Sequence, residues 1–344
     1  MTPKSLTAAV AALTLAVTTL TAEAQEVVLR YSNWVPTTHP IITDVIEPLK
    51  DDLEAATDGR VTIEVMPALG PPAGHFDLVA NGVADMAFTV HSYSPGRFTL
   101  TELGELPFGH DNVEVHSLAY WKTYNRYLAA ANEHDGVRLL GLWTNGPSQL
   151  ALRGALLSAP DAVEGRRVRV PGALLDKVTA KLGMVSISAP ITDAYEQISR
   201  GVIDGMYTQL QSMKDFELTE FLTHVSMVPG GFAQSSQMVI LSDAAYQRMS
   251  EPDRAAFDAL MGEALVRRFA RMWQSNAEAA EAYLKEAGTT LYKVPDETLL
   301  QLRSDLASLE SDWIAAAQER GVDGAAALAF FRSEIDKIAA GMEP

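Results

Sequence analysis

The chain has 344 residues, 47% of them hydrophobic, which is enough material for two domains with sizeable cores. It carries 44 acidic and 27 basic side chains, and the formal net charge of -17 argues against nucleic acids and anionic membrane surfaces as partners. It contains no cysteine, which excludes a disulfide scaffold.

The first residues have the pattern of a secretory signal peptide. Lys4 supplies a positive charge, and residues 8–20 are apolar but too short to span a bilayer as a helix. Ala22-Glu23-Ala24 then matches the small-x-small pattern of a cleavage site. We predict that residues 1–24 are removed and that the protein works in the periplasm; the alternative is an uncleaved membrane anchor.

The N-terminal part alternates between strand and helix patterns. Hydrophobic spacing predicts strands at 27–32, 60–66 and 84–90, and helices at 40–56 and about 74–82. This βαβαβ order predicts a parallel sheet with right-handed crossovers.

The alternation resumes from residue 137. We expect strands at 137–144, 148–153, 166–170, 184–188, 202–208 and 235–241, a turn at Asn145-Gly146-Pro147, and helices at 172–182 and 191–201. From Glu251 the pattern is almost entirely helical, at 251–287, 295–320 and 324–341. The predicted fold class is therefore α/β, with two α/β lobes followed by a helical C-terminal tail.

Three arginines stand together in EGRRVRVPG, residues 164–172. Because side chains alternate along a strand, Arg167 and Arg169 share one face and Arg166 lies on the other. Arg169 lies at the carboxyl end of the strand, where open parallel sheets bind ligands, and its guanidinium can hold both oxygens of a carboxylate. The alternative is a surface arginine on an edge strand.

A second arginine in the same half could reach the same anion. Arg153 ends the strand SQLALR, and the alternative for its side chain is a salt bridge to Asp161 or Glu164.

The segment VIDGMYTQ, residues 202–209, contains a turn at Asp204-Gly205 that is followed by polar side chains. Tyr207, Thr208 and Gln209 could donate hydrogen bonds into a cleft, or the segment could be an ordinary turn. We expect Asp204 to hold the loop in place and not to bind a ligand.

These motifs together resemble the solute-binding subunits of TRAP transporters, the DctP type. The segments that carry the resemblance are EGRRVRVPG, Leu182-Gly183, SAPITDAYEQISRGVIDG at 188–205 and NGVADMAFT at 81–89. The first and last of these segments match the family patterns G-[KR]-x-[IVL]-R-V-P and G-x-[AV]-D-[MI]. The other two resemble L-G-A-x-P, of which only the L-G is present, and E-[VL]-Y-x-A-L-x-x-G-x-[VI]-D-G, where Asp193-Ala194-Tyr195 replaces E-[VL]-Y. The resemblance covers essentially the whole chain after residue 24.

The resemblance implies a bilobed periplasmic binding protein in which two α/β lobes close on a ligand and a long helix packs across both. The expected lobes are 25–149 with about 233–275, and 150–232 with about 276–344. The implied function is capture of an organic acid and its delivery to a TRAP-type membrane permease, without catalysis or a cofactor, by a monomer. The alternative is a sensing subunit that presents the bound acid to a membrane receptor.

The resemblance also implies site residues. Arg169 falls on the family's hallmark arginine, Arg153 on an upstream arginine, and Thr208 on the polar position after the D-G turn, where Thr208-Gln209 replaces the usual Asn-Pro. The complete predicted substrate-binding set is Arg169, Arg153, Thr208, Tyr207, Gln209, Asn33, Trp34, His91, Ser92, Tyr93, Asn145 and Phe232.

The identity of the acid is less constrained by the sequence. Trp34 and Tyr207 favour a monocarboxylate with an apolar or ring-shaped body, and compact hydroxy or dicarboxylic acids remain open. The seven histidines show no metal-ligand spacing, so no metal site is expected.

Overall fold

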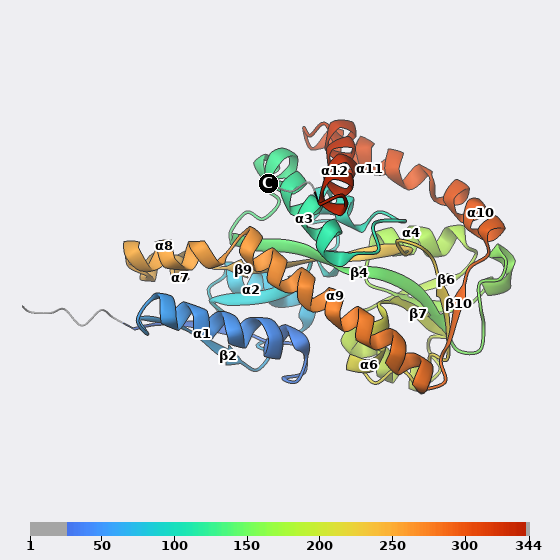
Figure 1. Ribbon diagram of the computed structural model, residues 1–344, viewed down its shortest axis with the longest axis horizontal. Helices are drawn as coiled ribbons and strands as arrows, with labels where there is room; N and C mark the ends of the chain where they lie inside the picture. The colour runs from blue at the N-terminus through green and yellow to red at the C-terminus, as the bar shows by residue number, and fades with distance from the viewer. Residues whose placement is uncertain (1–25, 342–344) are drawn as a thin grey trace, which may run out of the picture.

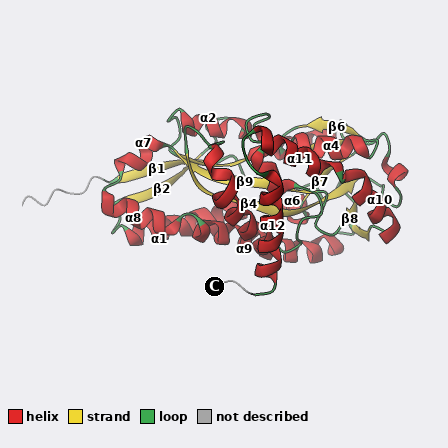
Figure 2. Ribbon diagram, turned by 90° about the horizontal axis from the view of Figure 1, so that it is seen from above, coloured by secondary structure: helices red, strands yellow, loops and turns green. Residues whose placement is uncertain are grey.

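The computed structural model describes residues 26–341, so the predicted signal peptide at residues 1–24 lies outside the described residues. The molecule is elongated, with strands between two layers of helices (Figures 1 and 2). It has the mixed α/β, bilobed architecture with a helical C-terminal region that the sequence predicts.

The first lobe is built on β1 (Val27–Ser32), β2 (Val61–Met66), β3 (Met86–Val90), β9 (Ala233–Leu241) and the first part of β4 (Arg138–Leu152). β1 pairs in parallel with β2 and β3, which confirms the parallel arrangement predicted for this segment. A π-helical turn (Ile41–Ile46) leading into α1 (Glu47–Ala56) forms the first crossover, and α2 (His75–Ala80) forms the second. β9 runs antiparallel between β3 and β4.

The second lobe continues on the other half of β4. Its strands are β5 (Arg167–Val170), β6 (Val185–Ser188), β7 (Gly205–Thr208), β8 (His224–Met227) and β10 (Thr290–Lys293), and its helices include α4 (Ala173–Lys181), α5 (Ala194–Ser199) and α6 (Leu210–Asp215). β5 lies between β6 and β7 and is parallel to both. β4 is antiparallel to β7 and β8, so one strand belongs to both lobes.

The turn predicted at Asn145-Gly146-Pro147 is wrong, because β4 passes through these residues as a single strand. β9 pairs along it on both sides of the segment, at Thr144 opposite Ser236 and at Pro147 opposite Gln234. The register shifts between Thr144 and Pro147, and Gly146 adopts a positive φ of 89°. The Gly-Pro signal therefore marks an irregularity within a paired strand.

The long helix crosses both lobes, as the resemblance predicts. The helical run expected over 251–287 is broken into α8 (Glu251–Leu260) and α9 (Glu263–Glu286), because Gly262 has φ 61°, which a helix does not accommodate. α9 packs on β4 and contacts α6 at its far end (Figure 1). Trp143 of β4 stacks on Phe269 of α9 with ring centroids 3.7 Å apart, which fixes the helix to the shared strand.

The remaining helices are α3 (Val113–Thr123) and α7 (Asp243–Arg248), which sequence patterns did not reveal, and the tail helices α10 (Asp296–Leu306), α11 (Ser308–Glu319) and α12 (Gly324–Ala339). α10 contacts α4, whereas α12 packs against α3. The residue bounds given for the two lobes stay a prediction. Within residues 26–341, no helix has both the length and the apolar character that crossing a bilayer requires.

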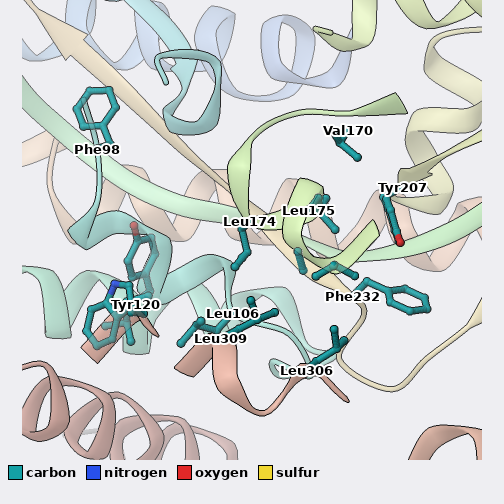
Figure 3. Close-up of a cluster of buried hydrophobic side chains, with 14 of the residues drawn as sticks. Phe98, Leu106, Tyr120, Val170, Leu174, Leu175, Tyr207, Phe232, Leu306 and Leu309 are labelled. Atoms are coloured by element: carbon teal, nitrogen blue, oxygen red, sulfur yellow. The ribbon is translucent and has the colours of Figure 1, made fainter. Parts of the chain in front are cut away.

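A large apolar cluster runs from the first lobe through the second lobe to the tail helices (Figure 3). Tyr207 and Phe232, ring centroids 5.3 Å apart, belong to it together with Val170 and Leu174. This cluster anchors the strands that carry the candidate site.

Candidate functional site

A cavity lies between the lobes, with walls from both of them. The centre of a water molecule can reach about 40 Å³ of it, so the cavity is narrow. It is lined by Trp34, Val35, His39, Ile41, Phe88, Val90, Tyr93, Asn145, Arg169, Pro171, Ile191, Tyr207, Thr208, Gln209, Ser212, Phe216, Ser235, Gln237 and Trp273.

Arg169 is the only basic side chain other than histidine in that lining of described residues. Its side chain is 3% exposed; Nε donates to the Ala189 carbonyl at 2.7 Å and Nη2 donates to the Tyr93 hydroxyl at 3.3 Å. No carboxylate among the described residues lies within 4.0 Å of it. Burial accordingly lowers the pKa of Arg169 from its usual value.

Tyr93 connects Arg169 to the edge of the cavity. Its hydroxyl accepts from Arg169 and from the Ile191 backbone N–H at 3.0 Å. Both of these groups can only donate, so the hydroxyl proton of Tyr93 remains available to a further acceptor.

Two amide side chains lie on neighbouring strands in the same wall. Gln237 of β9 accepts the indole N–H groups of Trp143 and Trp273 at 3.0 and 3.1 Å. Asn145 of β4 accepts the backbone N–H of Ser235 at 3.1 Å.

Aromatic rings form the apolar side of the cavity. Trp34 stacks on Phe88 at 5.2 Å between ring centroids and is tilted against Tyr93 at 6.0 Å. The Trp34 indole donates to the Phe88 carbonyl at 2.9 Å, so its orientation is fixed from within the first lobe.

His39 closes the cavity from the first lobe toward α6. Its Nδ1 accepts from the Ile41 N–H at 3.1 Å, and its Nε2 lies 3.7 Å from Oδ2 of Asp215. Burial lowers the pKa of His39 to about 4 and raises that of Asp215 to about 6. Both shifts favour the neutral forms, so this contact is a weak polar one and not an ion pair at neutral pH.

Seven of the residues that the sequence nominates meet around this cavity: Arg169, Thr208, Tyr207, Gln209, Trp34, Tyr93 and Asn145. Two of them differ in detail from the expectation. Tyr207 reaches the cavity at the end of β7, but its ring packs in the apolar cluster with Phe232 (Figure 3). Gln209 donates to the Ser148 hydroxyl at 2.6 Å and so holds β4.

The other five nominated residues do not line it. The Arg153 side chain is exposed; it donates to the Ile198 carbonyl at 2.8 Å and lies over the Phe221 ring, so neither predicted partner, Asp161 nor Glu164, is used. Asn33 bonds to the backbone of Val35.

The last three lie behind or beside the cavity wall. His91 bonds to His134 at 2.9 Å and to Ser236 at 2.9 Å, in the interior of the first lobe. Ser92 packs against Gly172, and Phe232 is fully buried in the apolar cluster.

Arg167, two residues before Arg169, has a different role. Its Nη2 donates to Asp204 at 2.8 Å and its Nε donates to the other oxygen of the same carboxylate at 3.1 Å. Asp204 also accepts the Arg167 backbone N–H, so it ties β5 to the turn before β7, as expected.

Sequence reasoning missed several lining residues, above all His39, Gln237 and Trp273. Gln237 interrupts the apolar strand SSQMVIL and shares a face with Ser235, which is the signal that could have revealed it. Within the described part of the chain, no group of three or more His, Asp or Glu side chains could hold a metal ion.

The sequence matches a known protein family and a known relative over most of its length. The DctP family model, described as bacterial extracellular solute-binding protein, family 7, matches residues 31–315. The outer membrane transporter protein TsaT of Comamonas testosteroni is 25% identical over 324 residues, which cover 92% of this chain and 94% of TsaT.

Two solved structures also cover nearly the whole chain. A TRAP periplasmic solute-binding protein from Bordetella bronchiseptica with bound (R)- and (S)-mandelate is 36% identical, with a TM-score of 0.88, over 91% of this chain and 99% of that one. A marine-metagenome TRAP solute-binding protein specific for aromatic acid ligands, in complex with metahydroxyphenylacetate, is 26% identical, with a TM-score of 0.85 and the same coverage.

Proposed function

Because the chain belongs to the DctP family of bacterial extracellular solute-binding proteins, we propose that it captures an aromatic monocarboxylate in the interlobe cavity and delivers it to a TRAP-type permease. Proteins of this family are substrate-binding proteins and not enzymes. The proposal assigns the carboxylate to Arg169 and the ring to the aromatic side of the cavity.

The observation that carries the proposal is the buried guanidinium of Arg169. A charge removed from water is costly unless an opposite charge and hydrogen bonds compensate it. Arg169 is 3% exposed, donates only to a carbonyl and a hydroxyl, and has no carboxylate among the described residues within 4.0 Å. A ligand carboxylate would supply the missing anion and accept from the free guanidinium N–H groups and from Tyr93.

The aromatic character of the ligand rests on the aromatic rings in the lining. Trp34, Phe88, Phe216 and Trp273 line the cavity, and stacked or edge-on contacts with such rings stabilise a ring-bearing ligand beyond simple burial. The similar proteins with bound mandelate and metahydroxyphenylacetate support the same class.

Delivery requires that the permease distinguish the loaded protein from the empty one. Because the cavity is lined by both lobes, a bound acid contacts both and stabilises their closed arrangement. We propose that the permease recognises this closed form, in the periplasm and with the protein as a monomer. Adjacent genes for small and large permease subunits would support delivery, and a membrane receptor gene in their place would favour sensing.

The test is a thermal-shift screen of the protein lacking residues 1–24, after unfolding and refolding to remove any copurified ligand. A ligand at a hundred times its dissociation constant adds about 2.7 kcal/mol of stability, which is readily detected. We expect aromatic monocarboxylates to stabilise the protein and Arg169→Ala to abolish the effect. Absence of any shift across aromatic, aliphatic and dicarboxylic acids would contradict the proposal.

A further inference from the structure

Gln237 has only one way to orient its amide. Trp143 and Trp273 both place their indole N–H groups on the same amide atom, at 3.0 and 3.1 Å. An indole N–H can only donate, so that atom is the amide oxygen. The NH2 group then points away from the two indoles, and no described residue accepts from it.

Gln237 is 4% exposed and lines the cavity, but its NH2 group is not among the buried side-chain atoms of the described residues that lack a partner, so this donor is open to the space of the cavity. A ligand that displaces water from the cavity must supply an acceptor in its place, because a donor left unpaired on burial is costly.

Asn145 repeats this arrangement on the adjacent strand. The backbone N–H of Ser235 can only donate, so it fixes the Asn145 oxygen, and the amide nitrogen has no acceptor among the described residues. Asn145 is 6% exposed and lines the same cavity.

The two amides lie close together on neighbouring strands. Gln237 is paired with Trp143, and Asn145 follows Trp143 by two positions on β4, where the register with β9 shifts. Both side chains line the same cavity, so both amides belong to one wall of it.

The other polar side chains of the cavity reinforce this donor character. Arg169 only donates, and the Tyr93 hydroxyl already accepts twice. The hydroxyls of Thr208, Ser212 and Ser235 can serve in either sense, and no Asp or Glu among the described residues lines the cavity. An acid with acceptor oxygens is therefore matched, whereas an ammonium group meets fixed donors and a like charge.

We propose that Gln237 and Asn145 are specificity residues that recognise a hydroxyl or oxo oxygen on the body of the acid and exclude the corresponding amino acid. The inference rests on the proposed function and adds to it a selection that Arg169 alone does not make. Carboxylate capture by Arg169 treats hydroxy, oxo, unsubstituted and amino acids alike, whereas the two amides distinguish them.

The test is calorimetric titration of the wild-type protein with five acids of one size class: mandelate, phenylglyoxylate, 3-hydroxyphenylacetate, phenylacetate and phenylglycine. We expect the tightest oxygen-bearing acid to bind at least about tenfold more tightly than phenylacetate, because phenylacetate leaves the donors unpaired. Phenylglycine should bind no better than phenylacetate.

Two shape-matched variants isolate the donors. Gln237→Glu keeps an oxygen for both indoles and Asn145→Asp keeps one for Ser235, but each replaces NH2 with an acceptor. At pH 8 each should lower the ratio of oxygen-bearing to unsubstituted affinity by at least about threefold and raise the ratio of phenylglycine to phenylacetate. Gln274→Glu is the control: it adds the same charge beside Trp273 on α9, does not line the cavity, and should leave both ratios unchanged.

The outcomes distinguish a failure of the proposed specificity residues from a failure of the proposed function. Equal wild-type affinities for mandelate, phenylglyoxylate, 3-hydroxyphenylacetate and phenylacetate, or phenylglycine binding as tightly as mandelate, would overturn the role of the amides and leave capture by Arg169 standing. This wild-type comparison decides the matter even where a variant fails to fold. If none of the five acids binds, the proposed aromatic class is wrong and the inference falls with it.

Discussion

Replacing Arg169 with alanine should remove ligand binding while leaving the fold intact. In the proposed complex the guanidinium is the ligand's only full positive partner, because it is the only arginine or lysine among the described residues that line the cavity. The variant would bury the ligand carboxylate in the same narrow space without its counter-charge. Removing one partner of a buried charge pair typically costs about 3–5 kcal/mol, which corresponds to a loss of affinity of roughly a hundredfold to a few thousandfold.

The empty protein should tolerate the change. Arg169 contributes two hydrogen bonds, to the Ala189 carbonyl and to the Tyr93 hydroxyl, and forms no ion pair with a described residue. The substitution also removes a buried charge, and the desolvation of that charge is what lowers the pKa of Arg169 in the wild-type protein. We expect the free energy of unfolding to change by less than about 2 kcal/mol.

Arg167→Ala is the matched control for this experiment. Arg167 lies on the same strand, but its side chain is 44% exposed and pairs with Asp204. An exposed pair contributes little to stability, and Arg167 does not line the cavity, so the variant should keep both its fold and its ligand affinity. Calorimetry measures the affinities and chemical denaturation measures the stabilities. Binding within threefold of wild type in Arg169→Ala, or an equal loss in Arg167→Ala, would show that Arg169 does not hold the ligand carboxylate.

Three further predictions concern Tyr93, Arg153 and Glu105. Tyr93→Phe removes a hydroxyl that accepts from Arg169 and Ile191, so calorimetry should show a loss of about 1–3 kcal/mol in binding; unchanged affinity would remove Tyr93 from the site. Arg153→Lys should leave affinity within a factor of about two, because that exposed side chain does not line the cavity; a tenfold loss in calorimetry would return it to the site. Burial raises the pKa of Glu105 to about 8, above its unfolded value near 4.3, so its contribution to stability is present below about pH 4 and is lost as the pH rises toward 8. Glu105→Gln should therefore lose less stability than wild type between pH 5 and 8 in denaturant titrations, and parallel losses would contradict the pKa shift.

The parts of the fold that local patterns specify could be predicted from the sequence. β1 was predicted with its observed bounds, because VVLRYS is a short run with a clear turn after it. The sequence predicts two strands in place of β4, because Asn145-Gly146-Pro147 is a turn signal in isolation. The pairing with β9, which is distant in sequence, overrides that signal.

The candidate site could likewise be predicted only in part from the sequence. Arg169 could be found because strand alternation, its place at a strand end and the R-V-P motif agree. Arg153 also lies at a strand end, but strand alternation does not single it out. The end of its strand places its side chain away from the cavity. His39 and Trp273 come from a loop and a long helix whose positions depend on tertiary packing, so no local pattern could nominate them.

A crystal structure of the protein lacking residues 1–24 with bound mandelate would show whether Arg169 holds the ligand carboxylate. We expect the carboxylate within hydrogen-bonding distance of the Arg169 guanidinium, the phenyl ring against Trp34 and Phe88, and the hydroxyl at the NH2 groups of Gln237 or Asn145. Mandelate bound elsewhere, or bound here with its carboxylate away from Arg169, would contradict this expectation.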